Sequence, residues 1–292
     1  MKTILVPTDF SKYSTNAILT ASAIAKMAGG EIILMHNVKT LLTRWERLPA
    51  SEQHKHPEVL QRSNEGLTKL QELEKSGHLN NIPVRKIITH GVTSDEIVRI
   101  AKENNVDIIV LGSHGNTPEG RDFIASTFQR VIREATCPVL CVKKPGDYTW
   151  KKVVLPDTFD FDISKPFEKV RQVAEVLGST IQLLYINTGN FRNTDTINQR
   201  MEAFQARYPT LKFERIIYDH ADIDKGILQF VEVEKPDYIA MITYDHKHHP
   251  KYLVSVTDTV VYHANIPVLT VCVNSAAVED SVTIKKDMAR TL

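Results

Sequence analysis

The run VDIIVLGSHG (Val106–Gly115), together with CPVLCV (Cys137–Val142) further on, decides the fold of this chain. Each run contains a short apolar stretch that indicates a buried strand, and the segment between them predicts a turn and then a helix from about Ala125. Glycines between a strand and a helix let backbone N–H groups approach an anion, and the positive end of the helix dipole faces it. The stretch therefore predicts an α/β fold that holds the phosphates of a nucleotide.

The spacing of the glycines excludes two common phosphate-binding patterns, G-x-G-x-x-G and G-x-x-x-x-G-K-[ST], since neither is present. It resembles the nucleotide-binding signature of the universal stress protein family, G-x2-G-x9-G-[ST], with Ala125 at the place of the third glycine. Five blocks resemble that family in the same order. They are residues 1–11, 32–36, 91–97, 107–111 and 136–140, so the resemblance covers roughly the first 145 residues.

The resemblance implies that the N-terminal half binds ATP, alone or with Mg²⁺. Ligands of open parallel sheets lie beyond the carboxyl ends of the strands, where the strand order reverses. The residues that we expect to bind the nucleotide follow such strand ends or begin the next helix. They are Pro7, Thr8, Asp9, Asn37, Val38, Gly112, Ser113, His114, Gly115, Ala125, Ser126 and Thr127.

Four of these residues also have a purely structural interpretation. The Asp9 carboxylate can accept hydrogen bonds from ribose hydroxyls or an adenine amino group, or it can cap the following helix. Gly112 and Gly115 suit phosphate or a tight turn, and Ser126 suits phosphate or a helix cap. Alanine at position 125 costs little if φ is negative there, but about 1 kcal/mol or more if φ is positive.

The chain repeats itself. Pro156 follows Pro7 by 149 positions in matching strand ends, and Pro267 follows Pro138 by 129 positions, so the second copy is shorter by about 20 residues. Alternating strands and helices predict a five-stranded, doubly wound parallel sheet of the Rossmann-like type in each copy. The expected domains are residues 1–146 and 147–275, which form a pseudo-dimer, and a C-terminal tail of residues 276–292.

The second copy lacks most of the phosphate-binding residues. In the sequence alignment Gly91 corresponds to Ala221, Gly112 to Thr243 and Gly115 to His246, and the first turn reads Pro156-Asp157-Thr158. We therefore expect no ATP site in this copy. Its loop of residues 245–249, with His220, has the residue types of a metal site, but solvated histidines are the interpretation that we favour over a metal.

Composition indicates an ordinary cytoplasmic protein. The formal net charge is +1, so neither nucleic acid nor membrane is expected as a partner. The odd count of three cysteines, without a C-x-x-C pair, is typical of reduced buried thiols. The polar segment from Lys39 to about His56 is expected to be a long irregular excursion, either a lid or docking surface or simply a mobile loop.

Three functions fit these features. We favour a stress-response protein that binds ATP as a regulatory or binding module and is not an enzyme, because no base or nucleophile pair stands at the site. The alternatives are a slow ATPase and a scaffold that binds no nucleotide. The apolar last strands, near Leu140 and Leu269, are expected to pair with each other inside one chain; the alternative is that each pairs with another molecule in a homo-oligomer.

Overall fold

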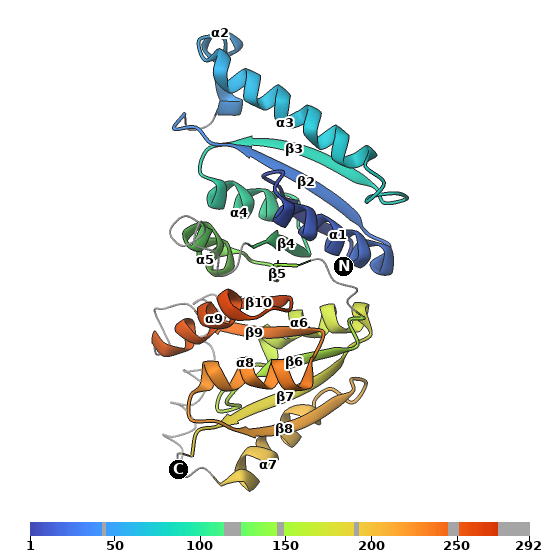
Figure 1. The fold of residues 1–292 in the computed structure, drawn as a ribbon, viewed down its shortest axis with the longest axis vertical. Helices are drawn as coiled ribbons and strands as arrows, with labels where there is room; N and C mark the ends of the chain where they lie inside the picture. Colours follow the sequence, from blue (N-terminus) through green and yellow to red (C-terminus); the bar gives the residue numbers. More distant parts are fainter. Residues whose placement is uncertain (43–44, 114–123, 145–148, 190–192, 245–250, 274–292) are drawn as a thin grey trace, which may run out of the picture. The chain divides into compact units, whose positions relative to one another are not determined.

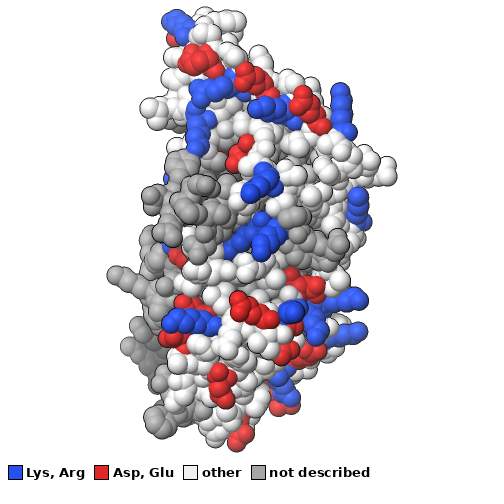
Figure 2. Space-filling view, viewed as in Figure 1, with Lys and Arg blue, Asp and Glu red and all other residues white. Residues whose placement is uncertain are grey.

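The computed structural model describes residues 1–42, 45–113, 124–144, 149–189, 193–244 and 251–273. The chain divides into two compact units, Met1–Asp147 (unit 1) and Tyr148–Leu292 (unit 2). Figure 1 draws unit 1 in blue to green and unit 2 in yellow-green to red. No helix within the described ranges is long and apolar enough to cross a membrane. On the face that Figure 2 shows, basic and acidic side chains are mixed on both units.

Unit 1 alternates strands and helices. Its elements are β1 (Thr3–Pro7), α1 (Lys12–Ala28), β2 (Glu31–Val38), the 3-10 helix η1 (Trp45–Arg47), α2 (Ala50–Gln53), α3 (Pro57–Lys75), β3 (Val84–His90), α4 (Thr93–Glu103), β4 (Ile108–Gly112), α5 (Ile124–Glu134) and β5 (Val139–Val142). The strands are parallel in the order β3-β2-β1-β4-β5. Because parallel crossovers are right-handed, α1 and α3 cover one face of the sheet and α4 and α5 the other.

Unit 2 repeats this plan. Its elements are β6 (Lys152–Pro156), α6 (Ser164–Leu177), β7 (Thr180–Asn187), α7 (Thr194–Gln205), β8 (Phe213–Asp219), α8 (Ile223–Glu234), β9 (Tyr238–Tyr244), α9 (Lys251–His263) and β10 (Val268–Val273). The strands are again parallel, in the order β8-β7-β6-β9-β10. The predicted doubly wound parallel sheet is confirmed in both halves. The expected pairing of the two last strands stays a prediction.

The central strands and first helices follow from the apolar pattern. Ile4, Leu5 and Val6 of β1 have no exposed surface, as expected for a strand covered on both faces, and burying one such side chain contributes about 1.5–3 kcal/mol. In α1 the apolar residues spaced by four and three, such as Ala17 and Ala21, are buried. Ser11 caps α1 and Gly29, with φ +63°, ends it.

The segment between β2 and α3 is not the irregular excursion that we expected. It contains η1 and α2, and Trp45 of η1 is only 3% exposed. Trp45 packs against Val38 and Val59, and its ring centroid lies 5.4 Å from that of His90. The prediction is wrong because burial of one large aromatic side chain, with Leu42 and Leu48 packed against the same cluster, orders a segment that is otherwise mostly polar.

The strand register corrects two positions of the sequence alignment. In unit 1 Leu5 of β1 pairs with Ile109 of β4, and in unit 2 the matching Val154 of β6 pairs with Ile239 of β9, so Ile109 corresponds to Ile239. Three residues further along each strand stand Gly112, opposite Val142, and Ile242, opposite Val271. The counterpart of Gly112 is therefore Ile242, and not Thr243.

The second correction concerns Gly91. The amide of Gly91 donates to the Val38 carbonyl (3.2 Å), and the amide of His220 donates to the matching Asn187 carbonyl (3.0 Å). The counterpart of Gly91 is therefore His220, and not Ala221. A sequence shift alone does not say where a single-residue insertion falls, whereas backbone hydrogen bonds do.

Gly112 lies against the first turn of α1. A Cβ atom added to Gly112 would stand 2.2 Å from the Tyr13 carbonyl oxygen and 2.7 Å from the Ser14 nitrogen. In unit 2 the first helix begins at Ser164, whose counterpart at the 149-residue spacing is Thr15, so α6 starts three residues later than α1. The shorter helix fits the presence of a side chain at Ile242. Gly112 is thus required for close packing of backbone on backbone.

Replacing Gly112 by alanine should therefore lower the free energy of unfolding by about 2–3 kcal/mol, since the overlap is with backbone atoms that no rotamer change relieves. Gly29→Ala at the other end of α1 is the matched control, because φ is +63° there but no atom lies within 4 Å of the added Cβ. That control should cost only about 1 kcal/mol. Urea denaturation measures both, and equal losses would contradict the packing role of Gly112.

Candidate functional site

The turn from β1 to α1 forms the centre of the candidate site. Thr8 is 5% exposed; its hydroxyl donates to Ser14 Oγ (3.0 Å) and accepts from the Phe10 amide (3.0 Å). Phe10 has φ +64°, a conformation that is uncommon for a residue with a side chain. These bonds hold the turn that connects the end of β1 at Pro7 to the N-cap of α1 at Ser11, and Asp9 stands at the tip of this turn.

Asp9 is exposed, and its Oδ1 atom accepts a hydrogen bond from the Ser11 amide (3.0 Å). It does not cap the helix, because Ser11 does so by accepting from the Ser14 amide. Partial burial raises the pKa of Asp9, but hydrogen bonds from Ser11 and Ser14 outweigh burial, so the pKa lies below its usual value. Asp9 is thus a carboxylate at neutral pH and can accept hydrogen bonds from a ligand's hydroxyl or amino groups.

Asn37 fastens the ends of β2 and β3. Its amide nitrogen donates to the Gly91 carbonyl (3.0 Å) and to Thr93 Oγ1 (3.0 Å), and its amide oxygen accepts from Thr89 Oγ1 (3.0 Å). The side chain is therefore engaged with the protein. Its backbone is better placed for a ligand. The Met35 carbonyl accepts from the Thr8 amide, and since backbone groups alternate along a strand, the Asn37 peptide faces the same side, beyond the end of β1.

Val38 has a core role. Its side chain is 3% exposed, packed with Trp45, and its carbonyl accepts from Gly91. The sequence does not show this, because Val38 is expected there as the first residue after a strand.

Ser113 has a structural role as well. It is buried and its amide donates to the Val142 carbonyl (2.8 Å), so it extends the β4–β5 ladder.

The phosphate end of the expected site falls mostly beyond the described residues. His114 and Gly115 lie outside them. Ala125 and Ser126 belong to α5, which begins at Ile124 close to where the sequence predicts a helix, but their side chains are outside the described part. Thr127, one residue further into α5, is half-buried. The roles of these residues in phosphate binding stay predictions.

The structure brings three residues to the site that the sequence analysis did not select, Phe10, His36 and Lys69. The ring centroids of Phe10 and His36 lie 4.5 Å apart, and His36 Nδ1 lies 2.8 Å from the Thr8 carbonyl oxygen. Lys69 of α3 places its Nζ atom 5.3 Å from the Phe10 ring centroid. Phe10 stands in the motif beside Asp9 and could have been selected. Lys69 could not, because the direction in which α3 presents it depends on packing.

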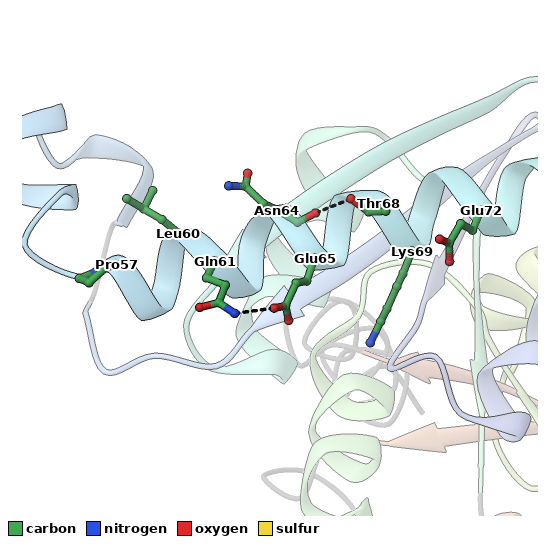
Figure 3. A pocket seen from close by; sticks show the side chains of 8 residues that line it. All are labelled: Pro57, Leu60, Gln61, Asn64, Glu65, Thr68, Lys69 and Glu72. Atoms are coloured by element: carbon green, nitrogen blue, oxygen red, sulfur yellow. Dashed lines mark hydrogen bonds between the residues drawn. The ribbon is translucent and has the colours of Figure 1, made fainter.

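A large surface hollow runs along α3 but does not enclose a ligand. Figure 3 shows that its lining residues all come from one side of this helix. They are Pro57, Leu60, Gln61, Asn64, Glu65, Thr68, Lys69 and Glu72. Gln61 donates to Glu65 along the helix (2.8 Å), as the dashed line shows. Because binding sites for small molecules are concave and take residues from several elements, we give this surface no ligand.

In unit 2 the corresponding turn is built around an acid. Asp157 stands at the position of Thr8, and its Oδ1 atom accepts from the Phe159 amide (2.6 Å). Phe159 has φ +54°, as Phe10 does at the matching place. The loop of residues 245–249, considered above for a metal, is outside the described residues. Within the described part, no group of three or more His, Cys, Asp or Glu side chains could hold a metal ion.

Comparison with known proteins gives one consistent result. Residues 1–143 match the model of the universal stress protein family. Universal stress protein MJ0577 of Methanocaldococcus jannaschii is 31% identical over 154 residues, which are 49% of this chain and 95% of that protein. MJ0531 of the same organism is 33% identical over 144 residues, 49% of this chain and 83% of that protein.

A universal stress protein from Archaeoglobus fulgidus is among the solved structures that are similar to nearly the whole chain. Its TM-score is 0.70 and its identity is 19%, and the match covers 92% of this chain and 98% of that chain. At this level of identity the likeness concerns the fold. It extends over both units, whereas the sequence matches cover about half of the chain.

Asp157 should make the stability of the protein depend on pH. Burial and the nearby Asp160 charge raise its pKa to about 6, against the opposing effect of the Phe159 hydrogen bond. A raised pKa in the folded state means that the neutral carboxyl stabilises the fold below about pH 4, and that this contribution is lost as the pH rises through 6.

Asp157→Asn keeps an oxygen acceptor for Phe159 but carries no charge. The free energy of unfolding of the variant minus that of wild type should be roughly 1–3 kcal/mol larger at pH 7.5 than at pH 4.5. Urea denaturation of both proteins at the two pH values measures the difference. A difference that is the same at both values would contradict the burial of an ionisable group.

Proposed function

This chain belongs to the universal stress protein family, and from that premise we propose that unit 1 binds one ATP molecule and acts as a nucleotide-dependent regulatory module in the stress response. The observation that carries the proposal is the turn of residues 8–11, which holds an ionised and exposed Asp9 at the point where the strand order reverses. Open parallel sheets bind ligands at such points.

The adenosine end of the ligand is assigned to the β1 and β2 ends. Asp9 would accept hydrogen bonds from the ribose hydroxyls or the adenine amino group, and the Asn37 peptide supplies one donor and one acceptor. The rings of Phe10 and His36 pack against each other next to Thr8 and Asp9. The hydrogen bonds of the Asn37 side chain fix the β2 end before a ligand arrives, which lowers the ordering cost of binding.

The phosphates are assigned to the segment from Gly112 to Thr127, with Mg²⁺ as an optional companion. This assignment rests on the glycine spacing and on the helix that follows it, whose free N–H groups favour an anion. Lys69, beside Phe10, adds a positive charge on the α3 side. ATP occupancy would then change the contacts that the protein makes with its partners.

We propose binding without turnover. A carboxylate whose pKa is lowered is a poor general base, since its affinity for a proton falls with its pKa. The protein would then work in the cytoplasm, where it meets intracellular ATP.

Titration calorimetry with ATP should give one site per chain. Asp9→Asn keeps the oxygen that accepts from Ser11 but removes the charge, so it should weaken ATP binding about tenfold or more. Asp157→Asn makes the same chemical change in unit 2 and should leave the affinity unchanged.

Three results would contradict the proposal in different ways. Two equivalent sites would mean that unit 2 also binds ATP, and the absence of binding would favour a scaffold without nucleotide. Sustained phosphate release from ATP that Asp9→Asn abolishes would favour an ATPase.

A further inference from the structure

Unit 2 contains a pocket at the carboxyl ends of β6, β7 and β9, the place that corresponds to the candidate nucleotide site of unit 1. Its volume is about 70 Å³, and residues from five elements line it. Asp157 forms one part of the wall, and aliphatic side chains such as Ile186, Ile227 and Ile242 form most of the rest. The pocket is therefore apolar with a single acid.

The residues that line this pocket differ in polarity from their counterparts in unit 1. The strand spacing and the matching ends of the helices identify the counterparts of the residues that line it. Four positions that are polar or glycine in unit 1 are aliphatic in unit 2. The pairs are Asn37 and Ile186, Thr93 and Ile223, Gly112 and Ile242, and Thr127 and Val256. In the opposite sense, the neutral Thr8 corresponds to Asp157. A phosphate would meet a negative charge here and no bare backbone.

Asp157 lacks a cationic partner within the described residues. One of its oxygens accepts from the Phe159 amide, and among the described residues no lysine or arginine affects its pKa. The nearest acid, Asp160, is already paired with Arg200. A carboxylate beside apolar walls is poorly solvated, and a positively charged hydrogen-bond donor relieves this.

We propose that this pocket binds a small primary ammonium that carries a short aliphatic chain, with the ammonium group at Asp157 and the chain against Ile186, Ile227 and Ile242. The volume of about 70 Å³ suits such a chain, because a pocket of this size holds only a few heavy atoms. The site is independent of ATP binding in unit 1, so either proposal can fail without the other.

Three four-carbon probes with different head groups test the proposal: butylammonium, butan-1-ol and butyrate. They are titrated into the full-length chain at pH 7.5, and the methyl signals of the isoleucines are followed by NMR. The signals of Ile186, Ile223, Ile227 and Ile242 report on the pocket, and that of Ile4, buried in unit 1, serves as an internal reference.

Butylammonium should shift the pocket signals saturably and bind on the order of tenfold or more tightly than butan-1-ol, and butyrate should not bind. Asp157→Asn should remove the preference for the cation. Glu168→Gln removes one charge from α6 in the same unit and should leave the preference intact. Ile223→Phe, which fills the pocket from the start of α8, should abolish binding of butylammonium.

Equal affinity for butylammonium in wild type and Asp157→Asn would overturn the proposal, as would binding that survives Ile223→Phe. Shifts that do not saturate, or that include Ile4 equally, would mean unspecific association and would also overturn it. If Asp157→Asn fails to fold, the comparison of the three probes with wild type and with Ile223→Phe still decides the question.

Discussion

One hydrogen bond closes the turn after the first strand of each unit, and the edge of the sheet that binds ligands depends on it. Thr8 accepts from the Phe10 amide at 3.0 Å, and Asp157 accepts from the Phe159 amide at 2.6 Å. The donor residue has positive φ in both cases, +64° and +54°, which costs about 1–2 kcal/mol for a residue with a Cβ. The bond helps to hold this conformation. Each turn carries one acid, which stands at the tip of the turn in unit 1 (Asp9) and at the acceptor position in unit 2 (Asp157).

A second constraint follows from where the first helix begins. In unit 1 the first turn of α1 lies so close to Gly112 that no side chain fits, so the backbone itself forms the edge. In unit 2 α6 begins later and Ile242 lines the pocket. Two sheets of the same topology therefore present opposite chemistry at the same place. One offers peptide groups and an exposed carboxylate, and the other offers an apolar wall around a poorly solvated acid.

Most of the fold could be predicted from the sequence, because the apolar runs and the repeat of Pro7 at Pro156 fix the order of strands and helices. The turn residues Thr8 and Asp9 could also be selected. Three features could not be. Trp45, with Leu42 and Leu48, orders the segment between β2 and α3 through burial. The partners of the Asn37 side chain come from β3, α4 and the turn between them, and the counterpart of Gly112 depends on hydrogen-bond register. All three are set by tertiary contacts between residues far apart in the chain.

The divergence of the two edges is tested most directly by a crystal structure of the full-length chain grown with ATP. The account predicts adenosine density between Asp9 and the Asn37 peptide of unit 1, with the phosphates running toward the start of α5. It also predicts that no nucleotide occupies the Asp157 pocket of unit 2. A nucleotide in the Asp157 pocket, alone or in addition to one in unit 1, would contradict the account.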